Sequence, residues 1–212
     1  MLAPQGSVYR TYDEGVAARQ VPSRPSTDAD LLAGEVGHRI RTLRTDAGIS
    51  LAVLAAESRL GKGTLSELER GQRNPTLDTL YAVATALRVP LSDLLVDGDP
   101  GTSGRALRAA PARGRSVVAQ LLDRWGDDDG FCEVYRVRLE DRVQRSAPHL
   151  AGVVETLTVV GGTVEVGAAD DPRTITTAES HTFPGDVPHL YRGVGGVATG
   201  VLTMYYPGPP GS

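Results

Sequence analysis

The sequence predicts two domains of different fold class, an all-α domain followed by an all-β domain. Residues 28–97 repeat apolar side chains at helical spacing, and we expect five helices there. Residues 118–212 hold short alternating stretches separated by turn residues, at the spacing of an all-β sandwich or barrel. Residues 98–117 between them are rich in Gly, Pro, Ala and Arg, which is typical of a linker. Residues 1–27 lack sustained periodicity and are expected to form a flexible tail.

The composition is that of a soluble globular protein, with 40% hydrophobic and 23% charged residues. No apolar run approaches the roughly 20 residues that span a bilayer, and the N-terminus lacks the basic and apolar regions of a signal peptide. The single cysteine, Cys132, excludes an internal disulfide framework and fits a reducing compartment. We therefore expect a cytoplasmic protein with no membrane partner.

Charge is spread unevenly along the chain. The net charge is −4, but residues 28–98 carry −2, residues 99–118 carry +3 and residues 119–212 carry −6. The whole-protein charge therefore argues neither for nor against nucleic-acid binding, because the local field decides. The linker arginines either add phosphate contacts or keep a flexible spacer solvated. They are Arg105, Arg108, Arg113 and Arg115.

Capping and stop residues mark the expected helices. Thr27 can cap the first helix, and Gly48 is a natural end for it. Ser50 can cap a second helix, "LAVLAAESRL", and a short third helix, "KGTLSELER", ends at Gly71. Thr76 starts a fourth, "LDTLYAVATAL", and "PLSDLL" forms the fifth. Two short helices joined by a tight turn within a bundle describe a helix-turn-helix.

The same region resembles the DNA-binding domain of the XRE, or phage-repressor, family. The resemblance covers about 60 residues and rests on the linked features "LAxxxRL", "LSELERG" and "NPTLDTLxxxAxALxVPLSDLL". It implies a bacterial transcriptional regulator whose third helix enters the major groove of an operator. One departure is Leu51, which stands where the family usually has a glutamine, so base reading would depend more on the third helix.

The resemblance also assigns candidate roles to individual side chains. Lys62, the only lysine in the chain, can donate to guanine, or it is an incidental surface lysine. Glu67 can accept from cytosine N4, or it is a solvated charge that only repels phosphate. Glu69 is expected to pair with Arg44 and hold the first helix to the third. The full predicted DNA-contacting set is Ser50, Leu51, Lys62, Gly63, Thr64, Ser66, Glu67, Arg70, Arg73 and Asn74.

In the all-β domain, "VVETLTVV" is expected to form a strand that continues through a two-residue Gly-Gly hairpin into "TVEV". Because side chains alternate along a strand, Glu155 shares one face with Val153, Leu157 and Val159. That apolar face should point inward. A carboxylate inside a barrel is costly unless it is paired, hydrogen-bonded or bound to metal, so the pattern indicates a site.

These stretches resemble the two motifs of the cupin (jelly-roll) family. His149, Glu155 and Gly162 fit the first motif, whereas Ala151 replaces its second histidine. The second motif matches less completely, because Pro184 and His189 fit while Asp186 stands in place of its glycine. The resemblance implies a ligand pocket that contains His149, Glu155, His189 and Tyr191.

Three functional hypotheses follow. The first is a DNA-binding regulator, expected to be a homodimer, whose cupin domain binds a small-molecule effector; it has no catalytic residues and no expected cofactor. The second is a metal-dependent oxidoreductase similar to the hydroxypropylphosphonate epoxidases, since His149, Glu155 and His189 would form the two-histidine, one-carboxylate set of non-haem iron enzymes. A divalent metal there is left open for the regulator too. The third makes the cupin domain a dimerisation module only.

Overall fold

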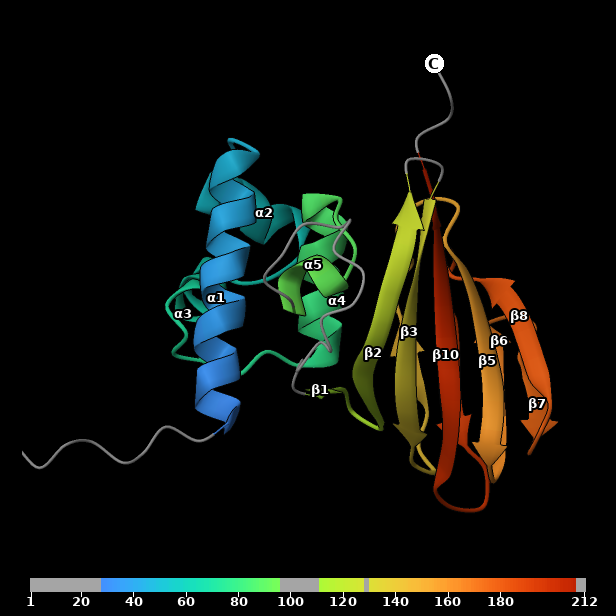
Figure 1. Ribbon diagram of the computed structural model, residues 1–212. Coiled ribbons are helices and arrows are strands. Elements are labelled where there is room, and N and C mark those ends of the chain that lie inside the picture. The colour runs from blue at the N-terminus through green and yellow to red at the C-terminus, as the bar shows by residue number, and fades with distance from the viewer. Residues whose placement is uncertain (1–27, 96–110, 128–129, 209–212) are drawn as a thin grey trace, which may run out of the picture.

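A computed structural model of the 212-residue chain describes residues 28–95, 111–127 and 130–208. It shows a helical domain lying beside a β-sandwich (Figure 1). The predicted tail, the helix-capping role of Thr27 and most of the predicted linker fall outside the described residues. No helix within the described ranges is both long and apolar enough to cross a membrane.

The five predicted helices are confirmed. Ser50 Oγ accepts a hydrogen bond from Val53 N at 3.3 Å and caps the second helix, and Thr76 caps the fourth in the same way. Gly48 follows the first helix with a φ of 68°, a left-handed conformation that glycine adopts at little cost. The helices are α1 (Asp28–Asp46), α2 (Leu51–Glu57), α3 (Lys62–Glu69), α4 (Leu77–Leu87) and α5 (Ser92–Leu95).

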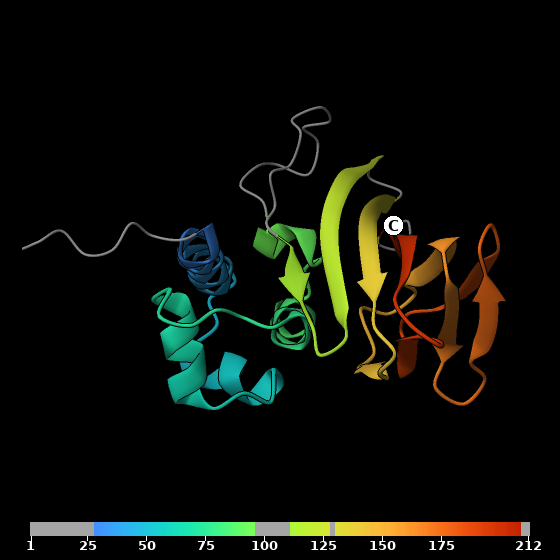
Figure 2. The same ribbon diagram turned by 90° about the horizontal axis from the view of Figure 1, so that it is seen from below.

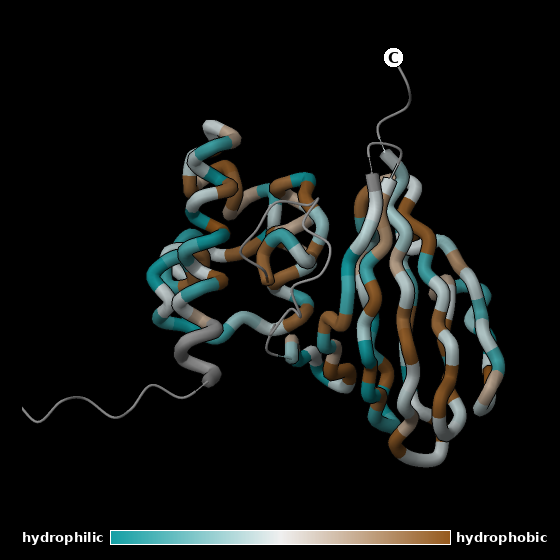
Figure 3. The backbone as a smooth tube through the Cα atoms, in the orientation of Figure 1, coloured by the Kyte–Doolittle hydropathy of each residue, from teal (hydrophilic) through white to brown (hydrophobic). Residues whose placement is uncertain are grey.

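Within the described residues, ten strands build the predicted all-β domain as a jelly-roll sandwich of two antiparallel sheets. One sheet has the strand order β1-β2-β3-β10-β5-β8 and the other has the order β4-β9-β6-β7. Apolar and polar residues alternate along the strands, which turn one face of each sheet inward (Figure 3). The strands are β1 (Ala112–Arg113), β2 (Val117–Asp127), β3 (Gly130–Leu139), β4 (Gln144–Ser146), β5 (Val154–Gly161), β6 (Thr163–Ala168), β7 (Arg173–Thr176), β8 (Ser180–Pro184), β9 (His189–Gly193) and β10 (Ala198–Pro207).

Two local features differ from the sequence-based expectation. The predicted Gly-Gly hairpin is wrong, because β5 pairs with β10 and β8 whereas β6 pairs with β7 and β9 in the other sheet. Gly162, with a φ of 91°, turns the chain around the corner between the sheets, since its conformational freedom suits a corner as well as a hairpin. In addition, β1 lies inside the segment expected to be linker and pairs with β2 of the sandwich.

The last two helices hold the helical domain against the sandwich (Figure 2). Ser92 N, at the start of α5, donates to the buried carboxylate of Glu133 at 3.1 Å. Arg124 on β2 forms an ion pair with Asp93 on α5, and both side chains are largely buried. The boundary between the domains is therefore packed and contains charged groups that water reaches poorly.

Candidate functional site

The candidate DNA-reading face lies on α3. Leu65 and Leu68 are buried in the bundle, and this fixes the opposite side of the short helix toward solvent. Lys62 occupies the first position of α3 and is exposed, as is Gly63. Thr64, Ser66 and Glu67 follow on α3 and are partly exposed. Ser50 caps α2, and Leu51 is its first residue. Arg70, Arg73 and Asn74 lie exposed just after α3.

Two ion pairs near this face differ in burial. Arg44 Nε contacts Glu69 Oε1 at 2.5 Å and Arg44 Nη2 contacts Glu69 Oε2 at 3.0 Å, with both side chains at most 13% exposed. Arg44 Nη1 also donates to the carbonyl of Ile49, which fixes the turn before α2. By contrast, Arg73 and Glu67 form a pair at 3.2 Å that is about half exposed. Arg73 can therefore leave Glu67 for a phosphate at little cost.

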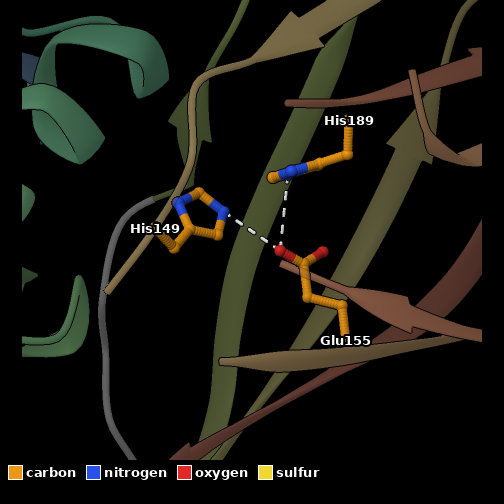
Figure 4. A group of neighbouring side chains, drawn as sticks. All are labelled: His149, Glu155 and His189. Atoms are coloured by element: carbon orange, nitrogen blue, oxygen red, sulfur yellow. Dashed lines mark ion pairs between the residues drawn. The ribbon is translucent and has the colours of Figure 1, made fainter. Parts of the chain in front are cut away.

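A second candidate site lies inside the β-sandwich, where three side chains from separate segments meet (Figure 4). Glu155 points inward from β5, His189 begins β9, and His149 comes from the loop between β4 and β5. Glu155 Oε1 lies 3.0 Å from His149 Nε2 and 3.4 Å from His189 Nε2. All three residues are at least 93% buried. The structure thus brings together three residues that the sequence assigned to one pocket.

Hydrogen bonds orient two of these side chains. His189 Nδ1 lies 2.7 Å from the carbonyl of Val187, so Nδ1 carries the proton and Nε2 presents its lone pair to the centre. The hydroxyl of Tyr191 donates to Glu155 Oε2 and leaves Oε1 toward the histidines. A ring nitrogen held by a backbone carbonyl, with the other nitrogen free, is the usual environment of a metal-binding histidine.

Electrostatics keep the centre in a form that can bind a cation. Burial raises the pKa of Glu155, but the two imidazoles and the Tyr191 hydroxyl outweigh it, so the pKa lies below its ordinary value. Burial lowers the pKa of His189, and Glu155 opposes that effect only in part. At neutral pH the centre therefore contains a carboxylate and a neutral His189 imidazole, the protonation states that metal ligands require.

The donor set fits a divalent metal. His149 Nε2, Glu155 Oε1 and His189 Nε2 lie in the interior with no well-aligned hydrogen-bond partner among the described residues, although they face one another. Ligand atoms at about 2.1 Å from one metal are roughly 3 Å apart, close to the two measured separations. Two imidazoles and one carboxylate are also a common protein ligand set for iron and related metals.

Gly185 makes room for this arrangement. A Cβ atom at residue 185 would lie 2.8 Å from Glu155 Oε1, so any side chain there would move the carboxylate. The family pattern had placed its glycine at Asp186, one position later. In the structure Asp186 instead accepts a hydrogen bond from Gly152 N at the surface. The sequence signal for Gly185 was therefore a glycine one position before the place where the second cupin motif has its glycine.

Tyr81 on α4 is the contributor that sequence reasoning missed. Its ring stacks on His149 with centroids 4.2 Å apart and planes at 24°, and its hydroxyl donates to Met204 Sδ at 3.4 Å. Nothing in the sequence links a tyrosine of the helical domain to the β-domain, because the contact depends on how the domains pack. Tyr81 and Tyr191 also line a narrow pocket between α4 and the sandwich. The other lining residues are Leu77, Asp78, Val117, Ala119, Val137, Leu139, Gln144, Ser146 and Leu202.

Known proteins resemble the chain in both domains. The helix-turn-helix family HTH_3 matches residues 40–94. The transcriptional regulator ClgR of Mycobacterium tuberculosis is 37% identical over 95 residues, which are 44% of this chain and 84% of ClgR. The chain belongs to the helix-turn-helix transcriptional regulators.

One related sequence and one similar crystal structure match this regulator beyond its helical domain. The HTH-type transcriptional regulator SutR of Escherichia coli is 29% identical over 166 residues, which are 77% of this chain and 90% of SutR. A crystal structure of an HTH_3 family transcriptional regulator from Vibrio cholerae superposes with a TM-score of 0.70 at 24% identity, covering 84% of this chain and 99% of that one. The combination of a helical domain with this β-domain therefore recurs in another protein.

Proposed function

We propose that this regulator is a cytoplasmic homodimer that reads an operator with α3 and senses a small-molecule effector with its cupin domain. The observation that carries the proposal is the pairing of two sites in one packed chain. One is an exposed polar helix in a regulator fold, and the other is a buried centre of two histidines and a carboxylate. A dimer would present two α3 helices to half-sites about 34 Å apart, or a multiple of that distance.

We further propose that His149, Glu155 and His189 hold a divalent metal ion in this centre. The supporting observation is the set of three buried ligand atoms aimed at one another, with Tyr191 and the Val187 carbonyl holding the outer atoms. Such an ion would supply Lewis acidity toward an oxygen or nitrogen atom of an effector. Gly185 keeps the carboxylate in place, and burial keeps bulk water away.

Effector binding changes DNA binding only when it favours one arrangement of the two domains, because equal affinity for both arrangements shifts nothing. The domain boundary can provide that difference. It contains the Arg124–Asp93 ion pair and the contact between Ser92 and Glu133, and the pocket beside Tyr81 opens there. A molecule entering the pocket would contact α4 directly.

Operator binding is tested with DNA selected by the full-length protein from a random library. Affinity is then measured at several salt concentrations for the wild type, Lys62→Ala and Arg73→Ala. We expect steep weakening with salt, since phosphate contacts release counterions. We also expect Lys62→Ala to lose sequence preference and Arg73→Ala to lose affinity for all sequences. Salt-independent binding, or two variants that bind like the wild type, would refute the role assigned to α3.

The metal is tested by elemental mass spectrometry of protein purified without chelator, beside the His189→Ala variant. About one equivalent of metal in the wild type, lost in the variant, supports the centre. Traces of metal in both would mean that His149, Glu155 and His189 are buried polar side chains that hold no metal. Oxygen consumption by iron-loaded protein with candidate substrates separates the sensor from the oxidoreductase alternative, because only the enzyme turns over.

A further inference from the structure

His149 is held differently from the other two members of the centre. His189 has its outer nitrogen against the carbonyl of Val187, and Glu155 has its outer oxygen against Tyr191. His149 Nδ1 is buried without a hydrogen-bond partner among the residues that the structure describes. The outer nitrogen of His149 therefore has no anchor like the one that holds His189, and the contact of its Nε2 with Glu155 Oε1 at 3.0 Å is on the inner side of the ring.

An aromatic ring from the helical domain takes the place of that hydrogen bond. Tyr81 lies nearly parallel to the His149 imidazole with ring centroids 4.2 Å apart, and the His189 ring lies 4.8 Å from the same imidazole with its plane turned by 68°. Tyr81 is itself fixed, because its hydroxyl donates to the sulfur of the fully buried Met204. The imidazole thus contacts a ring of another domain as well as its neighbour in the centre, and both contacts restrict its plane.

We propose that Tyr81 is a positioning residue of the metal centre. Its ring holds the His149 imidazole with Nε2 toward Glu155, and it does so from a helix of the DNA-binding domain. This inference rests on the metal centre proposed above. It couples metal binding at the centre to the position of α4 against the sandwich. A coupling of this kind is reciprocal. If bound metal changes the equilibrium constant for packing α4 against the sandwich by some factor, that packing changes the metal affinity by the same factor.

The contact can reach the DNA-reading helix through the packed core of the helical domain. Leu80, next to Tyr81 on α4, is 1% exposed and belongs to the same apolar core as Leu65 and Leu68 of α3. Close-packed side chains transmit displacement because the interior has little free volume. A shift of Tyr81 therefore moves a helix that is packed in one bundle with α3.

The test compares three variants of the full-length protein by Co²⁺ titration, followed through the visible absorption of the bound ion. Tyr81→Leu removes the ring, and Tyr81→Phe keeps it. Arg124→Gln breaks the ion pair with Asp93 at the same domain boundary without touching His149. We expect Tyr81→Leu to bind Co²⁺ about two- to tenfold more weakly, the size of one aromatic contact. Tyr81→Phe should bind Co²⁺ like the wild type. Arg124→Gln, which loosens the domain boundary but keeps the ring, should weaken Co²⁺ binding less than Tyr81→Leu does.

A second readout is hydrogen exchange of the α4 amides with and without Co²⁺. Saturating Co²⁺ should slow this exchange in the wild type and in Tyr81→Phe, whereas it should leave exchange in Tyr81→Leu unchanged. Far-ultraviolet circular dichroism checks that each variant folds. If Tyr81→Leu does not fold, Tyr81→Met provides a side chain of similar length without a ring, and the same result is expected.

The outcomes separate this inference from the function on which it rests. Equal Co²⁺ affinity in Tyr81→Leu and the wild type overturns the positioning role while the metal centre stands. Equal weakening in Tyr81→Leu and Arg124→Gln also overturns that role, because general loosening of the domain boundary would then explain both. A wild-type protein that binds no Co²⁺ removes the metal centre, and this role with it.

Discussion

The two candidate sites of this regulator hold their polar groups in opposite ways. Lys62 on α3 is exposed to solvent, and Arg73 just after α3 is only loosely paired, so both side chains are free to meet a partner. In the sandwich, His149 and Glu155 are enclosed, and their free atoms face each other. Polar groups at an exposed site change the free energy of folding little, and their side chains become ordered only when a partner binds. Polar groups at a buried site destabilise the fold unless a hydrogen-bond partner, a counter-charge or a metal ion satisfies them.

The largest expected effect contrasts the two ion pairs of the helical domain. Arg44→Ala removes both contacts to Glu69 and leaves a buried carboxylate unpaired, which should lower the free energy of unfolding by about 3 kcal/mol. Arg73→Ala breaks a half-exposed pair and should cost about 0–1 kcal/mol. Urea denaturation followed by helical circular dichroism measures both. Equal costs would show that burial does not govern these pairs.

The next effect concerns the buried centre. Among the described residues, Glu155 is the one that turns a carboxylate toward the two histidines, so Glu155→Gln should abolish Co²⁺ binding at micromolar concentrations. Tyr191→Phe removes only the hydrogen bond to the outer oxygen and should weaken binding about 10- to 100-fold. Glu165→Gln, at a partly exposed glutamate on β6, is the matched control and should bind normally. Normal binding by Glu155→Gln would exclude this centre as the metal site.

Some features of the fold and of the sites could be predicted from the sequence, and others could not. The caps at Ser50 and Thr76 and the inward face of Glu155 were predictable, because capping and strand alternation are local rules. The corner at Gly162 was not, since one glycine conformation serves a hairpin or a change of sheet. The role of Tyr81 was not predictable either, because it depends on the packing of two domains.

A smaller effect is expected on the exposed side of the comparison. Lys62→Ala should weaken binding to the selected operator about tenfold and change binding to unrelated DNA much less, since base contacts specify the sequence. Arg73→Ala should weaken binding to both DNAs alike and reduce the salt slope by about 1. Fluorescence anisotropy with labelled duplexes measures both. A Lys62→Ala protein that loses affinity equally for both DNAs would make Lys62 a phosphate contact instead.

The smallest expected effect comes from a second buried carboxylate in the same sheet. Met204 on β10 pairs with Glu155 on one side and with Glu133 on the other. The pKa of Glu155 is lowered by the imidazoles beside it, whereas burial raises the pKa of Glu133. The hydrogen bonds from Ser92 and Tyr135 to Glu133 oppose that rise only in part.

The direction of the resulting pH dependence follows from proton linkage. Folding raises the pKa of Glu133 above its ordinary value of 4.5, so the folded protein holds this proton more tightly than the unfolded chain does. The stability that this group contributes is present below pH 4.5 and is lost as pH rises through the folded pKa. The unfolding free energy of the wild type minus that of Glu133→Gln should therefore fall as pH rises above the ordinary pKa of 4.5. A difference that rises instead would mean that the nearby Arg124 outweighs burial, and Glu133 would then behave like Glu155.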